Sequence, residues 1–431
     1  MSLTLIAWFV TFAVLSVRAF THSATYGLAL YLFTFFVNPK TWWWGNDTIG
    51  DYRWNLAAAV VYSLAVVVER GQNPKQTRQG PVWPQLLAIA LLVNTSIVHF
   101  FLAPVLAVSF SRYLLVVKYV ALFVVLAANI HDAQALRLAL WSMTLGAGYI
   151  GYEVTINDEG RFIAGRLLGV GAAGVQEPNE LAALLGAVLP LAAGLFFTGS
   201  WREKLAIAIV GPMILNVILL CNSRGAFLSL ILGVVVFLAA TWGPARKRIL
   251  RGFALGLLAL VLLLGDPQIV DRFMTVFANA EEMDNSASYR LVIWGAALQV
   301  LREHPLGSGG DGFNRVYSRQ YLETGRSVHN GYLAEAVEWG IQGLGLKLLF
   351  MMAGAWLVVR TAWRRGAAYN AEAIILASCL ITSLAVVLAT SFFADFLDNE
   401  WGYWIVGFML GFARAYSSPA EVRPVQSEVR A

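Results

Sequence analysis

Long apolar runs separated by short polar connections make up most of this chain. Each run has about the length of a membrane-spanning helix, and none shows the alternation of a β-strand. Because lipid cannot hydrogen-bond to exposed backbone, only helices and closed barrels cross a membrane, and these runs predict helices. We therefore predict an all-α polytopic membrane protein with about 12–13 transmembrane helices. The expected spans lie near 3–20, 23–38, 55–69, 84–106, 112–130, 134–151, 180–198, 204–221, 225–243, 248–265, 341–360, 371–393 and 401–416.

One long polar segment, 266–332, interrupts this series of spans. Within it, Tyr289 to Leu301 carries apolar residues spaced by three and four positions, which predicts an amphipathic helix. The sequence His304 to Gly310 is rich in turn-forming residues and predicts a break. Asn330 to Trp339 predicts a second amphipathic helix that leads into the next span.

The basic loops predict the orientation in the membrane. Two clusters, Arg246 to Arg251 and Arg360 to Arg365, fall on the same side of the expected spans and are therefore placed in the cytoplasm. The segment 266–332 then lies outside the cytoplasm. We expect residues 1–416 to form one transmembrane domain that includes this loop, and 417–431 to form a flexible cytoplasmic tail.

Composition supports the same class. Hydrophobic residues make up 58% of the chain and charged residues 13%, which excludes a soluble protein of this length. The net charge of +5 is explained by cytoplasmic basic loops. The sequence has two cysteines, both in apolar runs, and contains no His/Cys cluster or HExxH motif. We therefore expect neither a cofactor nor a bound metal.

The strongest candidate for a functional residue is Arg224, which follows an apolar run at a membrane boundary. An ionisable residue at that depth is costly and often functional, although snorkelling to the interface is the alternative. The neighbouring Ser223 supplies a hydrogen-bonding group, and Gly225 permits close approach of a ligand. A guanidinium is the preferred bidentate partner of phosphate oxygens.

Two further candidates lie in the long loop. Arg290, next to Tyr289, begins the predicted loop helix, where a helix N-terminus also attracts anions. His329, followed by Asn330, lies where the loop returns to the membrane, and histidine is suited to general-base chemistry. A surface arginine and a solvated histidine remain the alternatives for these two positions.

Other residues have more open assignments. Asn179 lies at the start of a span, where it could cap the helix or contact a substrate. Lys118 lies in mid-span, so it is expected to line a cavity or pair with an acid. Glu338 or Glu335 could orient His329. Beside the two arginines, the residues that we expect to contact substrate are Ser223, Tyr289, Asn330, Asn179, Glu338 and Lys118.

These motifs occur in an order that resembles a known family. The order Glu177-Pro178-Asn179-Glu180, then Asn222-Ser223-Arg224-Gly225, Ser288-Tyr289-Arg290, His304-Pro305-Leu306-Gly307 and His329-Asn330-Gly331-Tyr332 resembles the O-antigen ligase/O-antigen polymerase superfamily. With the N-terminal Asn38-Pro39-Lys40, the chain looks most like the exosortase-associated branch of O-glycosylation ligases. That superfamily usually has about twelve spans.

The resemblance implies a glycosyltransferase of the bacterial inner membrane that acts in lipopolysaccharide biosynthesis. It would transfer glycan from undecaprenyl diphosphate to an acceptor hydroxyl, such as that of lipid A–core, at the periplasmic face. Arg224 and Arg290 match the family's diphosphate-binding arginines, and His329 matches the histidine that activates the acceptor. The reaction would invert the anomeric carbon and need no metal. The alternatives are a polymerase or a protein O-glycan ligase that uses the same site, and a solute transporter, against which the absence of internal repeats argues.

Overall fold

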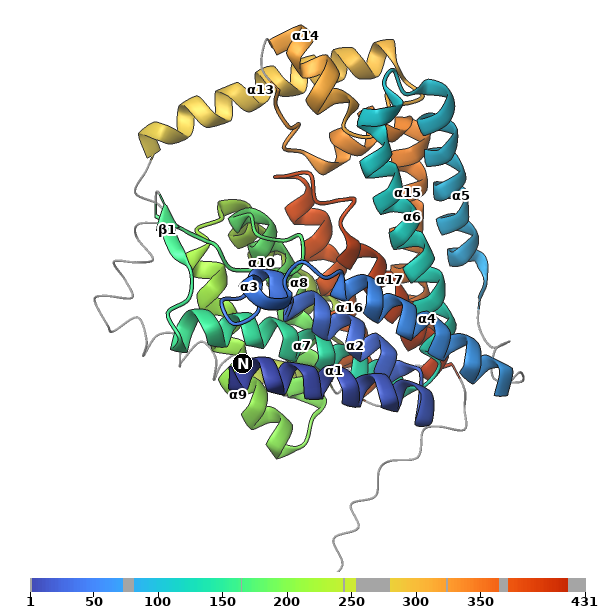
Figure 1. Ribbon diagram of the computed structural model, residues 1–431, viewed down its shortest axis with the longest axis vertical. Helices are drawn as coiled ribbons and strands as arrows, with labels where there is room; N and C mark the ends of the chain where they lie inside the picture. Colours follow the sequence, from blue (N-terminus) through green and yellow to red (C-terminus); the bar gives the residue numbers. More distant parts are fainter. Residues whose placement is uncertain are drawn as a thin grey trace, which may run out of the picture.

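The computed structural model describes residues 2–72, 81–163, 165–242, 245–252, 280–322, 325–363 and 371–417, and for 280–288 only the backbone. The predicted all-α architecture is confirmed. Helices make up most of the described chain, and the only strands within it form one short hairpin (Figure 1).

Twelve of the expected spans coincide with helices. These are α1 (Leu3–Thr21), α2 (Thr25–Phe36), α4 (Trp54–Gln72), α5 (Trp83–Ile97) extended by the π-helix η3 (Val98–Leu102), α6 (Leu106–Asn129), α7 (Ala133–Ile156), α8 (Pro178–Thr198), α9 (Trp201–Leu220), α10 (Arg224–Ala240), α15 (Gly331–Trp363), α16 (Ala371–Ser391) and α17 (Glu400–Ala415). The thirteenth, 248–265, lies mostly outside the described residues.

Seven helices within the described ranges are long and apolar enough to cross a membrane alone: α1, α5 with η3, α6, α8, α9, α15 and α16. Some of the other expected spans are short. The helices α2 and α17 have 12 and 16 residues, whereas a bilayer crossing takes about 20. The centre of the bundle is formed by α16, which packs against α8 and α10, and by α17, which packs against α15 and α6.

Between α2 and α8 the chain forms smaller elements. The 3-10 helix η1 (Pro39–Thr41) and α3 (Asn46–Ile49) follow α2, and the hairpin of β1 (Arg161–Ile163) and β2 (Arg166–Leu168) follows α7. The strands pair antiparallel, with Ile163 opposite Arg166.

The described part of the long loop forms a cap over one end of the bundle. It consists of α13 (Ala280–Glu303), the π-helix η4 (Phe313–Tyr317), α14 (Ser318–Leu322) and the beginning of α15. In Figure 1, α13 arches over the bundle with α14 above it. The cap has its own small hydrophobic core, formed by Ile293, Ala297, Val300, Phe313, Tyr317, Val328, Ala334 and Val337.

The predicted loop helices are confirmed, with two differences. The first helix begins at Ala280, earlier than the apolar spacing indicated. The second continues directly into the span as α15, but Gly340 interrupts it with φ 84° and ψ 164°. A side chain at Gly340 would lie 2.5 Å from the Leu306 carbonyl oxygen, so only glycine fits this close approach of the turn-rich break. The predicted break at His304 to Gly310 is also confirmed.

The remaining domain predictions are only partly covered by the described residues. Of the segment 266–332, residues 266–279 and 323–324 lie outside them, as does the predicted tail from 418 onward.

Candidate functional site

His329 lies in a turn that is tightly held on both sides. Its φ is +55°, in the left-handed region that costs a residue other than glycine free energy unless the surroundings fix it. On one side, the Ser327 hydroxyl donates to Asp395 Oδ2. On the other, the Asn330 N–H donates to Asp395 Oδ1 at 2.9 Å. A single carboxylate therefore brackets the histidine and holds the backbone of its turn.

Asn330, predicted to contact substrate, has a structural role here. Its Oδ1 accepts the N–H groups of Tyr332 and Leu333, both at 3.1 Å. These are orphan donors of the first turn of α15, so Asn330 acts as a helix N-cap. The cap fixes where α15 starts and therefore where the preceding His329 lies.

The helix α13 docks directly onto this turn. Trp294 Nε1 donates to the Val328 carbonyl oxygen at 3.0 Å, and the Trp294 ring meets the Phe392 ring edge-on at a centroid distance of 6.1 Å. Arg290 lies one helical turn before Trp294 and is partly buried. Side chains four apart share a helix face, so Arg290 projects from the face of α13 that contacts the His329 turn.

Arg224 begins α10 on a tight turn. Asn222 has φ +48°, and the Ser223 hydroxyl caps the helix by accepting the Ala226 N–H at 3.5 Å. A Cβ at Gly225 would lie 2.7 Å from Phe393 Cβ, so the start of α10 is in close contact with the residue after Phe392. Arg224 itself is exposed.

The segment between α16 and α17, which we call the α16–α17 connection (residues 392–399), thus contacts all three predicted catalytic elements. Phe393 packs against the start of α10. Phe392 packs against α13, and Asp395 holds the His329 turn. The segments that carry Arg224, Arg290 and His329 are far apart in the sequence, and each of them contacts this connection.

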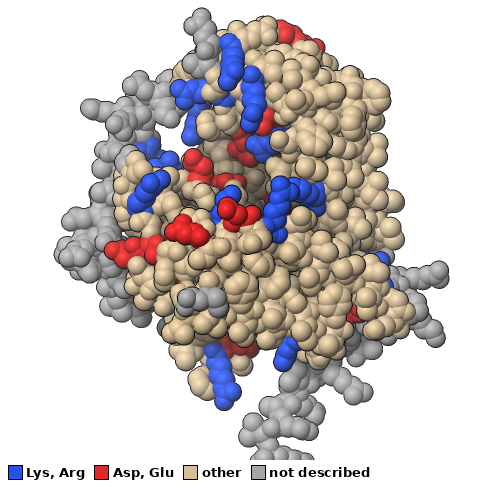
Figure 2. Space-filling model, in the orientation of Figure 1, with Lys and Arg blue, Asp and Glu red and all other residues tan. Residues whose placement is uncertain are grey.

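A second group of charges lies beside this connection. Arg112 pairs with Asp311 at 3.3 Å, and the Asp311 N–H donates to Glu338 Oε1 at 3.1 Å. Figure 2 shows acidic and basic side chains around a hollow on this face of the molecule. Glu338, which was considered as an orienting residue for His329, thus holds the turn at Asp311.

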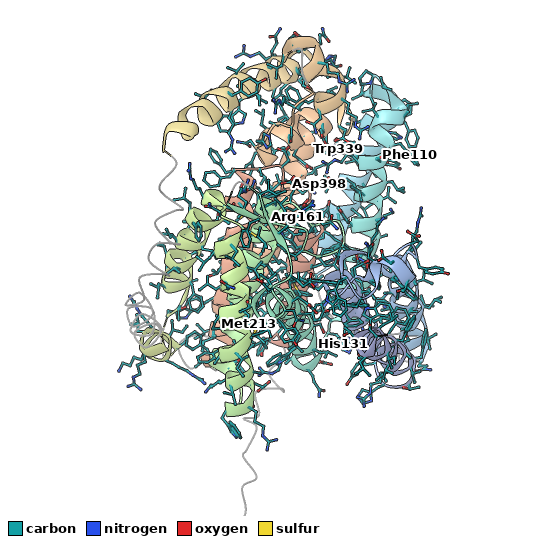
Figure 3. All side chains as sticks on the ribbon, turned by 60° about the vertical axis from the view of Figure 1, so that its left-hand side comes forward. Phe110, His131, Arg161, Met213, Trp339 and Asp398 are labelled. Atoms are coloured by element: carbon teal, nitrogen blue, oxygen red, sulfur yellow. The ribbon has the colours of Figure 1, made fainter. Side chains whose placement is uncertain are left out.

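The buried Lys347 forms ion pairs with two further carboxylates, those of Asp398 and Glu335. Its Nζ lies 2.7 Å from Asp398 Oδ1 and 4.0 Å from Glu335 Oε1, and it donates to the Tyr403 hydroxyl at 2.7 Å. Asp398 and Trp339 both lie below the α13 arch in Figure 3. Burial of a charged group is tolerated only when the charge is paired, as it is here.

The other predicted contacts are more scattered. Asn179 Oδ1 accepts from Arg166 at 2.5 Å. The guanidinium of Arg326 lies 5.6 Å from the Tyr289 ring centroid, a cation–π contact. Lys118, in the middle of α6, interacts electrostatically with the Glu400 carboxylate at the start of α17.

The pKa of the Glu303 carboxyl, at the end of α13, is shifted by a hydrogen bond within the cap. The Tyr321 hydroxyl donates to Glu303 Oε2 at 2.6 Å, and this hydrogen bond lowers the pKa of the Glu303 carboxyl. The contact ties α14 to the end of α13. It thereby contributes to the placement of the helix that carries Arg290.

Two residues of this region were missed in the sequence. Neither Asp395 nor Arg166 was a candidate in the sequence. Neither belongs to a local motif, because Asp395 and Ser327 are 68 positions apart in the chain, and Arg166 and Cys221 are 55 apart. Within the described ranges, no three His, Cys, Asp or Glu side chains come close enough to hold a metal ion.

Comparison with known proteins agrees with this arrangement. Residues 208–348 match the family described as O-antigen ligase. The matched range begins in α9, includes Arg224, Arg290 and His329, and ends in α15. No curated protein matches the chain. The match covers residues 208–348 of this multi-pass membrane chain, and this part is similar to the O-antigen ligase family.

Proposed function

We propose that this protein transfers a glycan from undecaprenyl diphosphate to an acceptor hydroxyl, in the first instance that of lipid A–core, at the periplasmic face of the inner membrane. The observation that carries the proposal is the α16–α17 connection, which contacts the start of α10, the Arg290-bearing face of α13 and the His329 turn. The O-antigen ligase match over the same residues supports the reaction class.

The arginines would act on the leaving group. As the bond between the anomeric carbon and the phosphate oxygen breaks, undecaprenyl diphosphate leaves with both electrons of that bond. Arg224 and Arg290 would stabilise its developing negative charge, an electrostatic contribution that is commonly the largest in such reactions. Tyr289, next to Arg290 on α13, would border the same space.

His329 would act on the acceptor. The acceptor hydroxyl oxygen attacks the anomeric carbon from the side opposite to the diphosphate, and its proton passes to the His329 imidazole. One direct displacement inverts that carbon. Because the donor bond is already activated and two cations face the leaving group, the proposed reaction requires no metal. Asp395 would hold the imidazole in place through the two hydrogen bonds on either side of it.

The acceptor is tested by the lipopolysaccharide of cells that lack this protein. Loss of O-antigen-capped lipopolysaccharide, with accumulation of lipid-linked polymer, is the result expected of a ligase. Single-repeat or missing polymer would show a polymerase, and an unglycosylated protein acceptor with normal lipopolysaccharide would show a protein O-glycan ligase. An unchanged glycan profile with a defect in solute uptake would contradict the transferase proposal.

A further inference from the structure

The β-hairpin between α7 and α8 places an additional arginine at the same end of the bundle as Arg224. Arg166 is the first residue of β2, which packs against α8 and α9. The hairpin is fixed to the body of the protein, since Leu167 is buried and the Ala173 N–H donates to the Phe35 carbonyl at 2.8 Å. Arg166 is partly buried and projects from a well-held element.

The Arg166 guanidinium joins two helix ends. Its Nη2 donates to Asn179 Oδ1 at 2.5 Å in the first turn of α8, and its Nε donates to the Cys221 carbonyl oxygen at 3.3 Å. Cys221 is the C-cap of α9. Carbonyl groups at a helix C-terminus lack helical partners and carry partial negative charge, so a cation is favoured there.

This contact lies directly before the turn that carries Arg224. Only Asn222 and Ser223 separate Cys221 from Arg224, and Asn222 has a left-handed backbone with φ +48°. Such a conformation persists where the surrounding structure fixes it. Arg166 holds the Cys221 carbonyl, where the turn starts, and the Ser223 cap holds the turn where it ends.

We infer that Arg166 is a positioning residue: through the Cys221 carbonyl and Asn179 it orients Arg224 toward the diphosphate of the lipid-linked donor. This inference rests on the proposed function. It also gives Asn179, which was predicted as a substrate contact, a different role as the second partner of Arg166. Because two donors of one planar group are used, lysine cannot replace arginine here.

Binding of undecaprenyl diphosphate to the purified full-length chain in detergent tests this inference without knowledge of the glycan. Arg166→Ala and Arg166→Lys are expected to weaken binding about tenfold, the effect of losing one charge-assisted hydrogen bond. The matched control is Arg161→Ala, an exposed arginine on the opposite strand that Figure 3 labels, with an expected change below about twofold.

A double-mutant cycle separates positioning from an independent contact. If Arg166 acts through Arg224, the double variant Arg166→Ala/Arg224→Ala binds undecaprenyl diphosphate as Arg224→Ala does. Additive losses, or an Arg166→Ala protein that binds as well as Arg161→Ala, would overturn the inference. If Arg166→Ala does not fold, Arg166→Lys carries the same test, since it keeps the charge and the stem.

Failure of the proposed function gives a different result. If Arg224→Ala binds undecaprenyl diphosphate as well as the wild type, the assignment of Arg224 to the diphosphate is wrong. If Arg224→Ala loses binding while Arg166→Ala keeps it, only the positioning role of Arg166 is wrong.

Discussion

Replacing Asp395 with asparagine should uncouple the His329 turn from the bundle while leaving donor binding in place. The carboxylate accepts two hydrogen bonds, from the Ser327 hydroxyl and from the Asn330 N–H. Asparagine has nearly the same volume but only one acceptor oxygen, so one of the two donors would face an NH₂ group.

The size of the effect follows from that lost bond. A hydrogen bond to a charged group contributes about 1.5–3 kcal/mol, and a left-handed residue such as His329 cannot hold its conformation without support. If loss of this hydrogen bond destabilises the productive position of the imidazole by the same free energy, the turnover rate kcat falls by about tenfold to a hundredfold. The KM for the lipid-linked donor should change little, since the arginines lie on other elements.

The assay is glycan transfer by the purified variant at saturating donor, with folding checked by thermal unfolding in detergent. Ser327→Ala removes one of the two bonds and should have a smaller effect on kcat. Asp51→Asn, at an exposed position away from the site, is the control for the same chemical change. The reasoning is refuted if folded Asp395→Asn keeps more than half of the wild-type kcat, or loses no more than Asp51→Asn.

Three other substitutions have defined outcomes. Lys347→Met should lower the free energy of unfolding by about 3–5 kcal/mol, because the Asp398 carboxylate 2.7 Å away loses its partner. Thermal melting measures this loss, and adding Asp398→Asn to the same chain should restore part of the stability. Gly340→Ala should lower the free energy of unfolding by about 1–3 kcal/mol, because φ is +84° there. The control Gly345→Ala, in the same helix but with open space around it, should not destabilise the protein. Equal melting temperatures of the two variants would disprove the strain at Gly340. Arg290→Lys should lower transfer about tenfold or more, since lysine lacks the planar fork, and wild-type rates would exclude a bidentate contact.

Much of the fold could be predicted because its signals are local. The length of the apolar runs gave the helices from α1 to α17, and the apolar spacing after Tyr289 gave α13. The predicted boundary between the loop helix, which ends at Trp339, and the span from 341 coincides with the interruption at Gly340. Its cause could not be predicted, because a glycine in a helical run carries no sign of the carbonyl that approaches it in the fold. The shortness of α2 was apparent, because the expected span 23–38 is shorter than a bilayer crossing needs and polar residues flank it, His22 before and Asn38 at its end.

The site was less accessible from the sequence. Arg224, Arg290 and His329 attracted attention through their types and their positions beside apolar runs. The residues that hold them, Asp395 and Arg166, act through contacts between distant segments, and no periodicity or spacing encodes such pairings. For the same reason Asn330 was predicted to contact substrate, although the structure uses its side chain as a helix cap.

The central claim is tested most directly by one transfer measurement with the purified chain. Lipid-linked glycan extracted from cells that encode the protein is incubated with lipid A–core in the presence of EDTA, and released undecaprenyl diphosphate is quantified for the wild type and for His329→Ala. The account predicts release by the wild type that is matched by glycan on the acceptor, and no release above background by His329→Ala. Equal release by both proteins, or release that appears only when Mg²⁺ or Mn²⁺ replaces EDTA, would contradict it.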